Sequence, residues 1–229
     1  MKHAFFVTGT DTDTGKTHVT CALLHATRRQ GWTAVGMKPI AAGIEDDGHN
    51  GDVVRLMAAS STTPPLDWVT PFLYAPFIAP HIAAREAGRP IEIRVIQQAL
   101  ERLQSLADVV WVEGVGGFRV PLDECYDTAD LACILALPVV LVVGMRLGCL
   151  NHALLTAEAI SRQGLTLAGW IANRIDPAMA YFEENLDTLR TRLDAPLLGV
   201  IPHGSSPEQV APLLHLSVLP GFDTALASV

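Results

Sequence analysis

The sequence has few charged side chains, and most of them are acidic. Charged residues make up 17% of its 229 residues and give a net charge of −8, whereas about 25% of residues are charged in typical soluble domains. Without an excess or a run of basic residues, the chain is a poor candidate for binding nucleic acid or an anionic membrane surface. Any phosphate group that it binds must therefore be held by local residues.

Paired cysteines and long apolar segments are also missing. The four cysteines form no CxxC pair, which argues against a zinc site or a disulfide framework and favours a reducing compartment. The first residues, MKHAFFVTGTD, lack the apolar region and cleavage site of a signal peptide. The most apolar run, residues 135–144, is about half as long as a membrane-spanning helix. These absences predict a cytoplasmic protein.

Short apolar runs alternate with helical patterns along the whole chain. Hydrophobic residues make up 49% of the sequence, enough for a substantial core. We expect strands over residues 4–7, 34–37, 109–113, 139–143, 168–172 and 198–201. We expect helices over residues 16–30, 52–59, 93–105, 150–163 and 178–192. The alternation predicts a single α/β domain over residues 1–229, with a mainly parallel sheet flanked by helices.

Residues 61–90 break this alternation. Six prolines exclude a continuous helix, while four large aromatic residues argue against a solvated linker. We expect an ordered excursion packed on the domain. From His203 onward, the sequence predicts a short peripheral helix and a tail.

The motif Gly9-Thr-Asp-Thr-Asp-Thr-Gly15-Lys16-Thr17 follows the first predicted strand and opens the first long helix. Glycines let backbone N–H groups approach phosphate oxygens at a helix N-terminus. In such loops the lysine binds the β- and γ-phosphates and the hydroxyl binds Mg2+. Five residues separate the glycines instead of the usual four, so this is a variant phosphate loop. The alternative is a simple helix start capped by Asp13 or Thr14.

Two carboxylates are candidates for a metal site near the phosphate loop, because the carboxyl ends of parallel strands meet at one edge of the sheet. Glu113 ends the apolar strand Val-Val-Trp-Val-Glu, where an acid can hold Mg2+ near a phosphate loop. Asp52 follows Asn50-Gly51 and begins a helix. By itself it is better interpreted as a helix N-cap, although it can also serve as a second metal carboxylate.

Five segments, in order along residues 1–202, resemble the dethiobiotin synthetase family. They are GTDTDTGKT at 9–17, GMKPIAAG at 36–43, VEGVGGFRVPL at 112–122, RLGCLNHALLT at 146–156 and LAGWIAN at 167–173. The resemblance implies a homodimer with a three-layer P-loop NTPase fold. It also implies a ligase of biotin biosynthesis that uses ATP and Mg2+ to form dethiobiotin from 7,8-diaminopelargonate and CO2, through a carbamate and a carbamic-phosphoric anhydride.

The same resemblance implies roles for individual residues. The catalytic residues would be Lys16, Lys38 and Thr12. The nucleotide would be bound by Asp13, Thr14, Gly15, Lys16, Thr17, Glu113, Asn173 and Pro202. The diamine would contact Thr12, Lys38, Gly116 and Gly117 and, in a site at the subunit interface, the neighbouring subunit's segment of Gly148, Cys149, Leu150 and Asn151. The magnesium ligands would be Thr17, Asp52 and Glu113.

Three positions depart from the family pattern: Asp13 stands where Glu is common, Ala42 where Ser is common and Arg146 where Lys is frequent. They suggest weaker diamine binding rather than another function. Partitioning ATPases of the ParA/MinD type, which serve as ATP-driven switches, are an alternative, but they carry an additional lysine early in the loop. A cobyrinate-type amidotransferase synthetase is a further alternative, although it needs a glutaminase domain for which this chain has no room.

Overall fold

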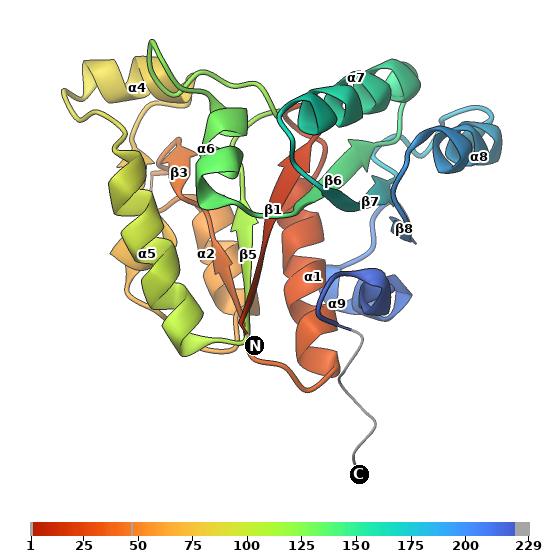
Figure 1. The fold of residues 1–229 in the computed structure, drawn as a ribbon, viewed down its shortest axis with the longest axis horizontal. Helices are drawn as coiled ribbons and strands as arrows, with labels where there is room; N and C mark the ends of the chain where they lie inside the picture. The colour runs from red at the N-terminus through yellow and green to blue at the C-terminus, as the bar shows by residue number, and fades with distance from the viewer. Residues whose placement is uncertain (1, 47, 223–229) are drawn as a thin grey trace.

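The computed structural model describes residues 2–46 and 48–222, and its centre is a parallel sheet with helices on both faces (Figure 1). The six strands lie in the order β2-β5-β1-β6-β7-β8, and every neighbouring pair is parallel. Their bounds are β1 His3–Gly9, β2 Ala34–Met37, β5 Val109–Glu113, β6 Val139–Gly144, β7 Leu167–Asn173 and β8 Leu197–Ile201. The predicted fold class and all six predicted strands are confirmed.

The central strand β1 shows why the apolar runs form buried strands. Successive side chains point to opposite faces of a sheet, so Phe5 and Val7 belong to one core cluster and Ala4 and Phe6 to another. All four are almost fully buried. A strand covered on both faces needs consecutive apolar residues, which is the pattern of this segment.

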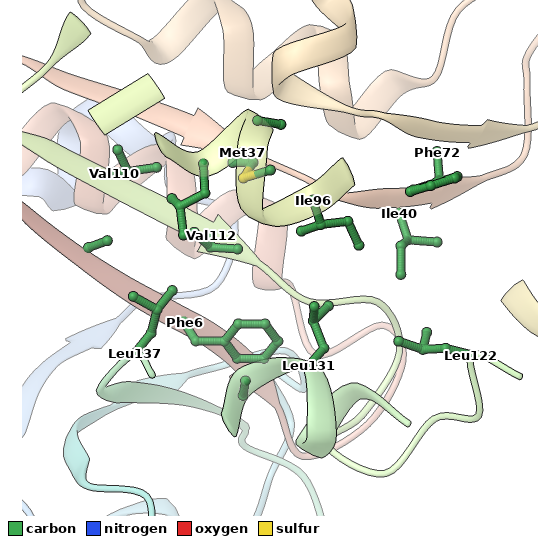
Figure 2. Packing of buried hydrophobic residues seen from close by; sticks show 14 of the residues in the cluster. Phe6, Met37, Ile40, Phe72, Ile96, Val110, Val112, Leu122, Leu131 and Leu137 are labelled. Atoms are coloured by element: carbon green, nitrogen blue, oxygen red, sulfur yellow. The ribbon is translucent and has the colours of Figure 1, made fainter. Parts of the chain in front are cut away.

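Helices cover the two faces in separate groups. Helices α1 (Lys16–Arg29), α2 (Gly51–Ala59) and α9 (Pro207–Val210) contribute to the cluster that contains Phe5. Helices α5 (Ile93–Leu106) and α6 (Thr128–Leu135) pack on the other face, where Figure 2 shows Ile96 and Leu131 beside the strand residues Phe6 and Val112. Helices α7 (Cys149–Arg162) and α8 (Phe182–Arg192) pack with β6 and β7.

The proline-rich excursion is ordered, as predicted. It contains α3 (Leu66–Val69), β4 (Phe72–Tyr74) and α4 (Pro80–Glu86). Strand β4 pairs in parallel with β3 (Ile40–Ala42) to form a second, two-stranded sheet. Arg89 closes the excursion, because its Nη2 donates to the carbonyl of Pro71 at 2.6 Å while its own carbonyl accepts from the hydroxyl of Tyr74 at 2.8 Å.

Some predicted boundaries were wrong. Helix α8 begins at Phe182 rather than residue 178, because Asp176 accepts a hydrogen bond from the Ala178 N–H in a turn and Tyr181 has a left-handed φ of 54°. Helix α6 was not expected, although Asp127 and Asp130 form a capping box at its start. In the C-terminal part, α9 is followed by 3-10 turns at Ala211–Leu213 and Leu216–Val218, and the end of the predicted tail lies outside the described residues.

None of the helices in residues 2–46 and 48–222 combines the length and apolar composition needed to cross a bilayer.

Candidate active site

The phosphate loop connects β1 to α1 at the carboxyl end of the sheet, and its glycines are required by close contacts. Gly15 has a φ of 80°, and a Cβ there would lie 2.2 Å from Nδ2 of Asn173. A Cβ on Gly9 would lie 2.4 Å from Oγ1 of Thr14. Gly15 is itself the N-cap of α1, with no side-chain cap, so the alternative of a cap at Asp13 or Thr14 was wrong. A helix start without a side-chain cap leaves backbone N–H groups available to an anion.

Lys16 is buried in this loop with its charge poorly compensated. It is 7% exposed, and its Nζ donates to the carbonyl of Asp11 at 2.9 Å. Burial lowers the pKa of Lys16, although the nearby carboxylate of Glu113 opposes that shift. Within residues 2–46 and 48–222, no carboxylate lies at ion-pair distance from Lys16. This ammonium group is therefore suited to receive an anionic ligand.

Lys38, by contrast, lies between two carboxylates. Its Nζ is 2.6 Å from Oδ2 of Asp52 and 2.7 Å from Oε1 of Glu113. The sheet register explains the second contact: Met37, the last residue of β2, pairs with Val112 of β5, so the residues that follow, Lys38 and Glu113, lie at the same level. Desolvation lowers the pKa of Lys38, but the two carboxylates outweigh it and raise that pKa overall. Thr17 joins the cluster by donating from Oγ1 to Oε1 of Glu113 at 2.7 Å.

Asp52 is not the N-cap of its helix, so its interpretation as a cap was wrong. Asn50 caps α2 by accepting from the N–H of Val53 at 3.2 Å, which leaves the Asp52 carboxylate for Lys38 and Arg55. The Nη2 of Arg55 lies 2.7 Å from Oδ1 of Asp52. Burial raises the pKa of Asp52, but Lys38 more than reverses this effect and the net shift is downward.

The predicted magnesium ligands lie together around Lys38. The carboxylate oxygen Oε2 of Glu113 is buried and has no hydrogen-bond partner, in a side chain that is fully buried. An oxygen of this kind is a hard ligand of the type that Mg2+ prefers. Thr17, Asp52 and Glu113 thus fit a divalent cation, completed by ligand and water oxygens. They supply only two carboxylates, and the described residues contain no group of three or more acidic, histidine or cysteine side chains suited to a metal.

The other predicted nucleotide and diamine residues surround the loop from two sides. A Cβ on Gly116 would lie 3.7 Å from Oγ1 of Thr12, and one on Gly117 would lie 3.8 Å from the carbonyl of Gly9. On the other side, Nδ2 of Asn173 donates to the carbonyl of Thr14 at 2.8 Å. Pro202 follows the neighbouring strand β8 and is exposed. The residues expected to contact the adenine and the diamine therefore include Asn173 on one side of the phosphate loop and Gly116 and Gly117 on the other.

The segment from Gly148 to Asn151 is less buried than this cluster, because Gly148 and Asn151 are exposed and Leu150 is half-buried, although Cys149 is buried. Gly148 is the N-cap of α7 with a φ of 95°, and a Cβ there would meet nothing within 4 Å. Leu147 beside it is 95% exposed. The thiol of Cys149 is buried, and desolvation raises its pKa, in agreement with a packing role rather than a nucleophilic one.

Two features near the site were not predicted. Asp11 of the phosphate loop forms an ion pair of 2.9 Å with Arg146 of the β6–α7 loop. A cavity of about 560 Å³ lies between α1, α2 and residues 204–208, with His18, His25 and Glu208 in its lining. Each joins residues that are far apart in the chain, so spacing along the sequence could not reveal either one.

Comparisons with known proteins first define the class. The sequence profile of a family described as an AAA domain matches residues 3–209. The septum site-determining protein MinD of Pyrococcus horikoshii, solved in complex with Mg-ADP, covers 100% of both chains with a TM-score of 0.62 and 16% identity. Chloroplast FtsY of Physcomitrella patens covers 96% of this chain and 66% of its own, with a TM-score of 0.54 and 16% identity. At these identities the likeness shows the fold alone, which is that of P-loop NTPases.

Curated relatives then define the family. A protein of Aromatoleum aromaticum named ATP-dependent dethiobiotin synthetase BioD is 61% identical over 93% of this chain and 97% of its own. Proteins of the same name from Nitrosospira multiformis and Pseudomonas aeruginosa are 55% and 50% identical, over 89% and 95% of this chain and 89% and 97% of their own. The chain belongs to the dethiobiotin synthetase family, whose members are ATP-dependent ligases of biotin biosynthesis.

Proposed function

We propose that this protein closes the ureido ring of dethiobiotin from 7,8-diaminopelargonate and CO2, at the expense of ATP. The observation that carries the proposal is a cluster at the end of the phosphate loop, in which the buried Lys16, Lys38, Thr17 and Glu113 lie together with the partly exposed Asp52. Family membership supports the choice of substrates. All four cysteines are free thiols, which supports a reducing, cytoplasmic location.

The reaction has three stages. One amine of the substrate adds to CO2 and loses a proton, giving a carbamate. A carbamate oxygen then attacks the γ-phosphorus of ATP, the bond to the bridging oxygen breaks, and ADP leaves. The second amine attacks the carbonyl carbon of the mixed anhydride and loses a proton to solvent, and phosphate leaves as the five-membered ring closes. Phosphoryl transfer of this kind depends on positioning and charge neutralisation rather than on covalent catalysis.

Lys16 and Lys38 would have different electrostatic roles in the reaction. Lys16, which has no carboxylate partner, would bind the β- and γ-phosphates and stabilise the charge that develops during transfer. Lys38 would orient the carbamate oxygen toward the phosphorus, because its ammonium group is fixed between Asp52 and Glu113. Thr17, Asp52 and Glu113 would hold Mg2+, which when bound would neutralise charge on the phosphate oxygens.

The remaining residues would position the reactants. Asp13, Thr14 and Gly15 belong to the loop that would receive the phosphates, and Asn173 and Pro202 would flank the base, where an amide can both donate to and accept from a purine edge. Near the carbamate, Thr12, Gly116 and Gly117 would shape the diamine site, because the two glycines allow the backbone to approach closely.

Product formation tests the proposal directly. Purified protein incubated with diaminopelargonate, bicarbonate, Mg2+ and ATP should give dethiobiotin and ADP in equal amounts, measured by mass spectrometry and a coupled ADP assay. The Lys16→Met variant should lose about 100- to 1000-fold in kcat/KM, because a charged group directed at the transition state is removed. Folded protein that binds ATP but forms no dethiobiotin would show that the substrate assignment is wrong.

We also propose a homodimer in which Gly148, Cys149, Leu150 and Asn151 of one subunit receive the carboxylate tail of the diamine held by the other. The open N-terminus of α7 supports this arrangement, since a helix N-terminus favours an anion. Two inactive variants, Lys16→Met and Asn151→Asp, should complement each other when mixed and refolded. Mixed dimers would contain one intact site, so roughly a quarter of the wild-type activity should return. No recovery would place the segment in its own subunit's site.

A further inference from the structure

Asp11 lies at the centre of the hydrogen bonds that shape the phosphate loop. Its backbone carbonyl accepts from Nζ of Lys16 at 2.9 Å and from Oγ1 of Thr14 at 3.1 Å. Its carboxylate oxygen Oδ1 accepts from the N–H of Thr12 at 2.7 Å. A shift of Asp11 would therefore move the groups proposed to contact the phosphates and the carbamate.

Arg146 links Asp11 to the start of α7. Its Nη2 donates to Oδ2 of Asp11 at 2.9 Å, and its backbone carbonyl accepts from the N–H of Cys149 at 3.0 Å. A second hydrogen bond, 3.4 Å long, runs from the N–H of Gly144 to Oγ1 of Thr10. An unbroken series of polar contacts thus extends from Lys16 through Asp11 and Arg146 to the segment proposed to bind the carboxylate tail.

Charge gives this ion pair a direct bearing on nucleotide binding. A carboxylate in a phosphate loop repels a triphosphate, and a guanidinium beside it offsets part of that repulsion. Asp11 and Arg146 are 49% and 41% exposed in their side chains, so the pair makes a modest contribution to stability. Its effect should instead appear in how strongly the bound diamine changes the affinity for the nucleotide, and the bound nucleotide the affinity for the diamine.

We propose that Asp11 and Arg146 form a positioning pair that couples phosphate binding at the loop to binding of the diamine tail at the N-terminus of α7. The proposal rests on the function proposed above. When the Lys16 ammonium binds a triphosphate, the Asp11 carbonyl loses its hydrogen bond from Lys16 and Asp11 shifts. Arg146, which is paired with Asp11, moves with it and displaces the N–H of Cys149 to which its carbonyl is bonded. Because such coupling is reciprocal, bound diamine tightens nucleotide binding by the same factor.

The test is a comparison of affinities in the full-length protein. The Kd of a non-hydrolysable ATP analogue is measured by calorimetry without and with saturating diaminopelargonate, and the ratio of the two values is the coupling factor. Asp11→Asn and Arg146→Gln should move the affinity for the nucleotide alone in opposite directions, up and down respectively. Both should lower the coupling factor by about two- to fivefold, the range expected for a part-exposed pair, and Arg146→Lys should restore part of it.

A matched pair on the same helix provides the control. Arg162 and Glu158 form an ion pair of 2.6 Å at the far end of α7, and Arg162→Gln should leave the coupling factor unchanged. A wild-type coupling factor of one, an unchanged factor in Arg146→Gln, or an equal decrease in Arg162→Gln would each overturn the inference while dethiobiotin synthesis by the wild type still stands. If the wild type makes no dethiobiotin, both the proposed function and this inference are wrong.

Discussion

The phosphate loop and the end of strand β2 each place a buried lysine at the same edge of the sheet, but in opposite electrostatic states. Lys16 is bound to a backbone carbonyl, and burial lowers its pKa. Lys38 lies between Asp52 and Glu113, and after the cost of desolvation these carboxylates raise its pKa. The first lysine is short of negative charge without a ligand, and the second is already compensated.

This difference predicts that Lys16 serves mainly to bind an anionic ligand, whereas Lys38 also stabilises the folded protein. An ammonium group that is buried without a counter-ion opposes folding until an anion arrives. An ammonium group shared by two carboxylates is part of the folded structure, and its loss leaves those carboxylates uncompensated. Removal of either lysine should impair catalysis, but in the unliganded protein only the removal of Lys38 should lower the free energy of unfolding.

The largest expected effect in the unliganded protein is on stability. Lys38→Met should lower the free energy of unfolding by about 3 kcal/mol, because it leaves the buried Glu113 carboxylate unpaired. Lys16→Met should leave that free energy unchanged or raise it. Urea denaturation with EDTA present measures both, and adding Glu113→Gln to Lys38→Met should recover part of the loss. If Lys16→Met were less stable than the wild type and Lys38→Met were equally stable, the proposed difference between the two lysines would be wrong.

A smaller effect is expected from Mg2+ without nucleotide. In the wild type the Lys38 ammonium lies between the two candidate metal carboxylates, so added Mg2+ has to compete with it. In Lys38→Met the two carboxylates no longer have the Lys38 ammonium between them, and the cation should raise Tm by about 2–4 °C more than in the wild type, equivalent to about 1 kcal/mol for a chain of this size. Calorimetric scans in Mg2+ and in EDTA measure this difference, with Lys16→Met as the control. Equal shifts in all three proteins would argue against Asp52 and Glu113 as metal ligands.

The smallest effect is on pH dependence. The pKa of Asp52 is depressed below its ordinary value of 3.8, so its stabilising contribution is present above that pH and is lost as the pH falls through the depressed value. The pKa of Lys38 is raised above 10.5, so its contribution is present below that pH and is lost as the pH rises through the raised value. The difference in unfolding free energy between the wild type and Asp52→Asn, less than about 1 kcal/mol for a part-exposed carboxylate, should therefore stay constant from about pH 4 to pH 10 and disappear in stronger acid. A difference that grows in acid would contradict this assignment.

Much of the fold could be predicted because its signals are local. Residues 34–37 and 109–113 matched β2 and β5 at both ends, since runs of consecutive apolar residues are typical of strands covered on both faces. The three-residue strands β3 and β4 were missed because each is held by the other across a long excursion. Helix α6 has a local signal in its capping box, but its eight residues carry only a weak helical period.

The phosphate loop of the candidate site was easier to predict from the sequence than the charged residues that surround it. The glycines, Lys16 and Thr17 form one continuous motif, so the loop could be found by inspection. Asp52 could not be distinguished from a helix cap until Asn50 was seen to cap α2. The Asp11–Arg146 pair joins residues 135 positions apart, and no spacing rule connects them.

The sequence by itself determined the parallel α/β fold and the phosphate loop, because hydrophobic periodicity and glycine geometry act over a few neighbouring residues. Tertiary structure decided which charged side chains form ion pairs. Strand register placed Lys38 level with Glu113, the cap at Asn50 left Asp52 available to that lysine, and the β6–α7 loop brought Arg146 to Asp11. Electrostatic energy depends on distance through space and on burial, and both are set only when distant segments pack together.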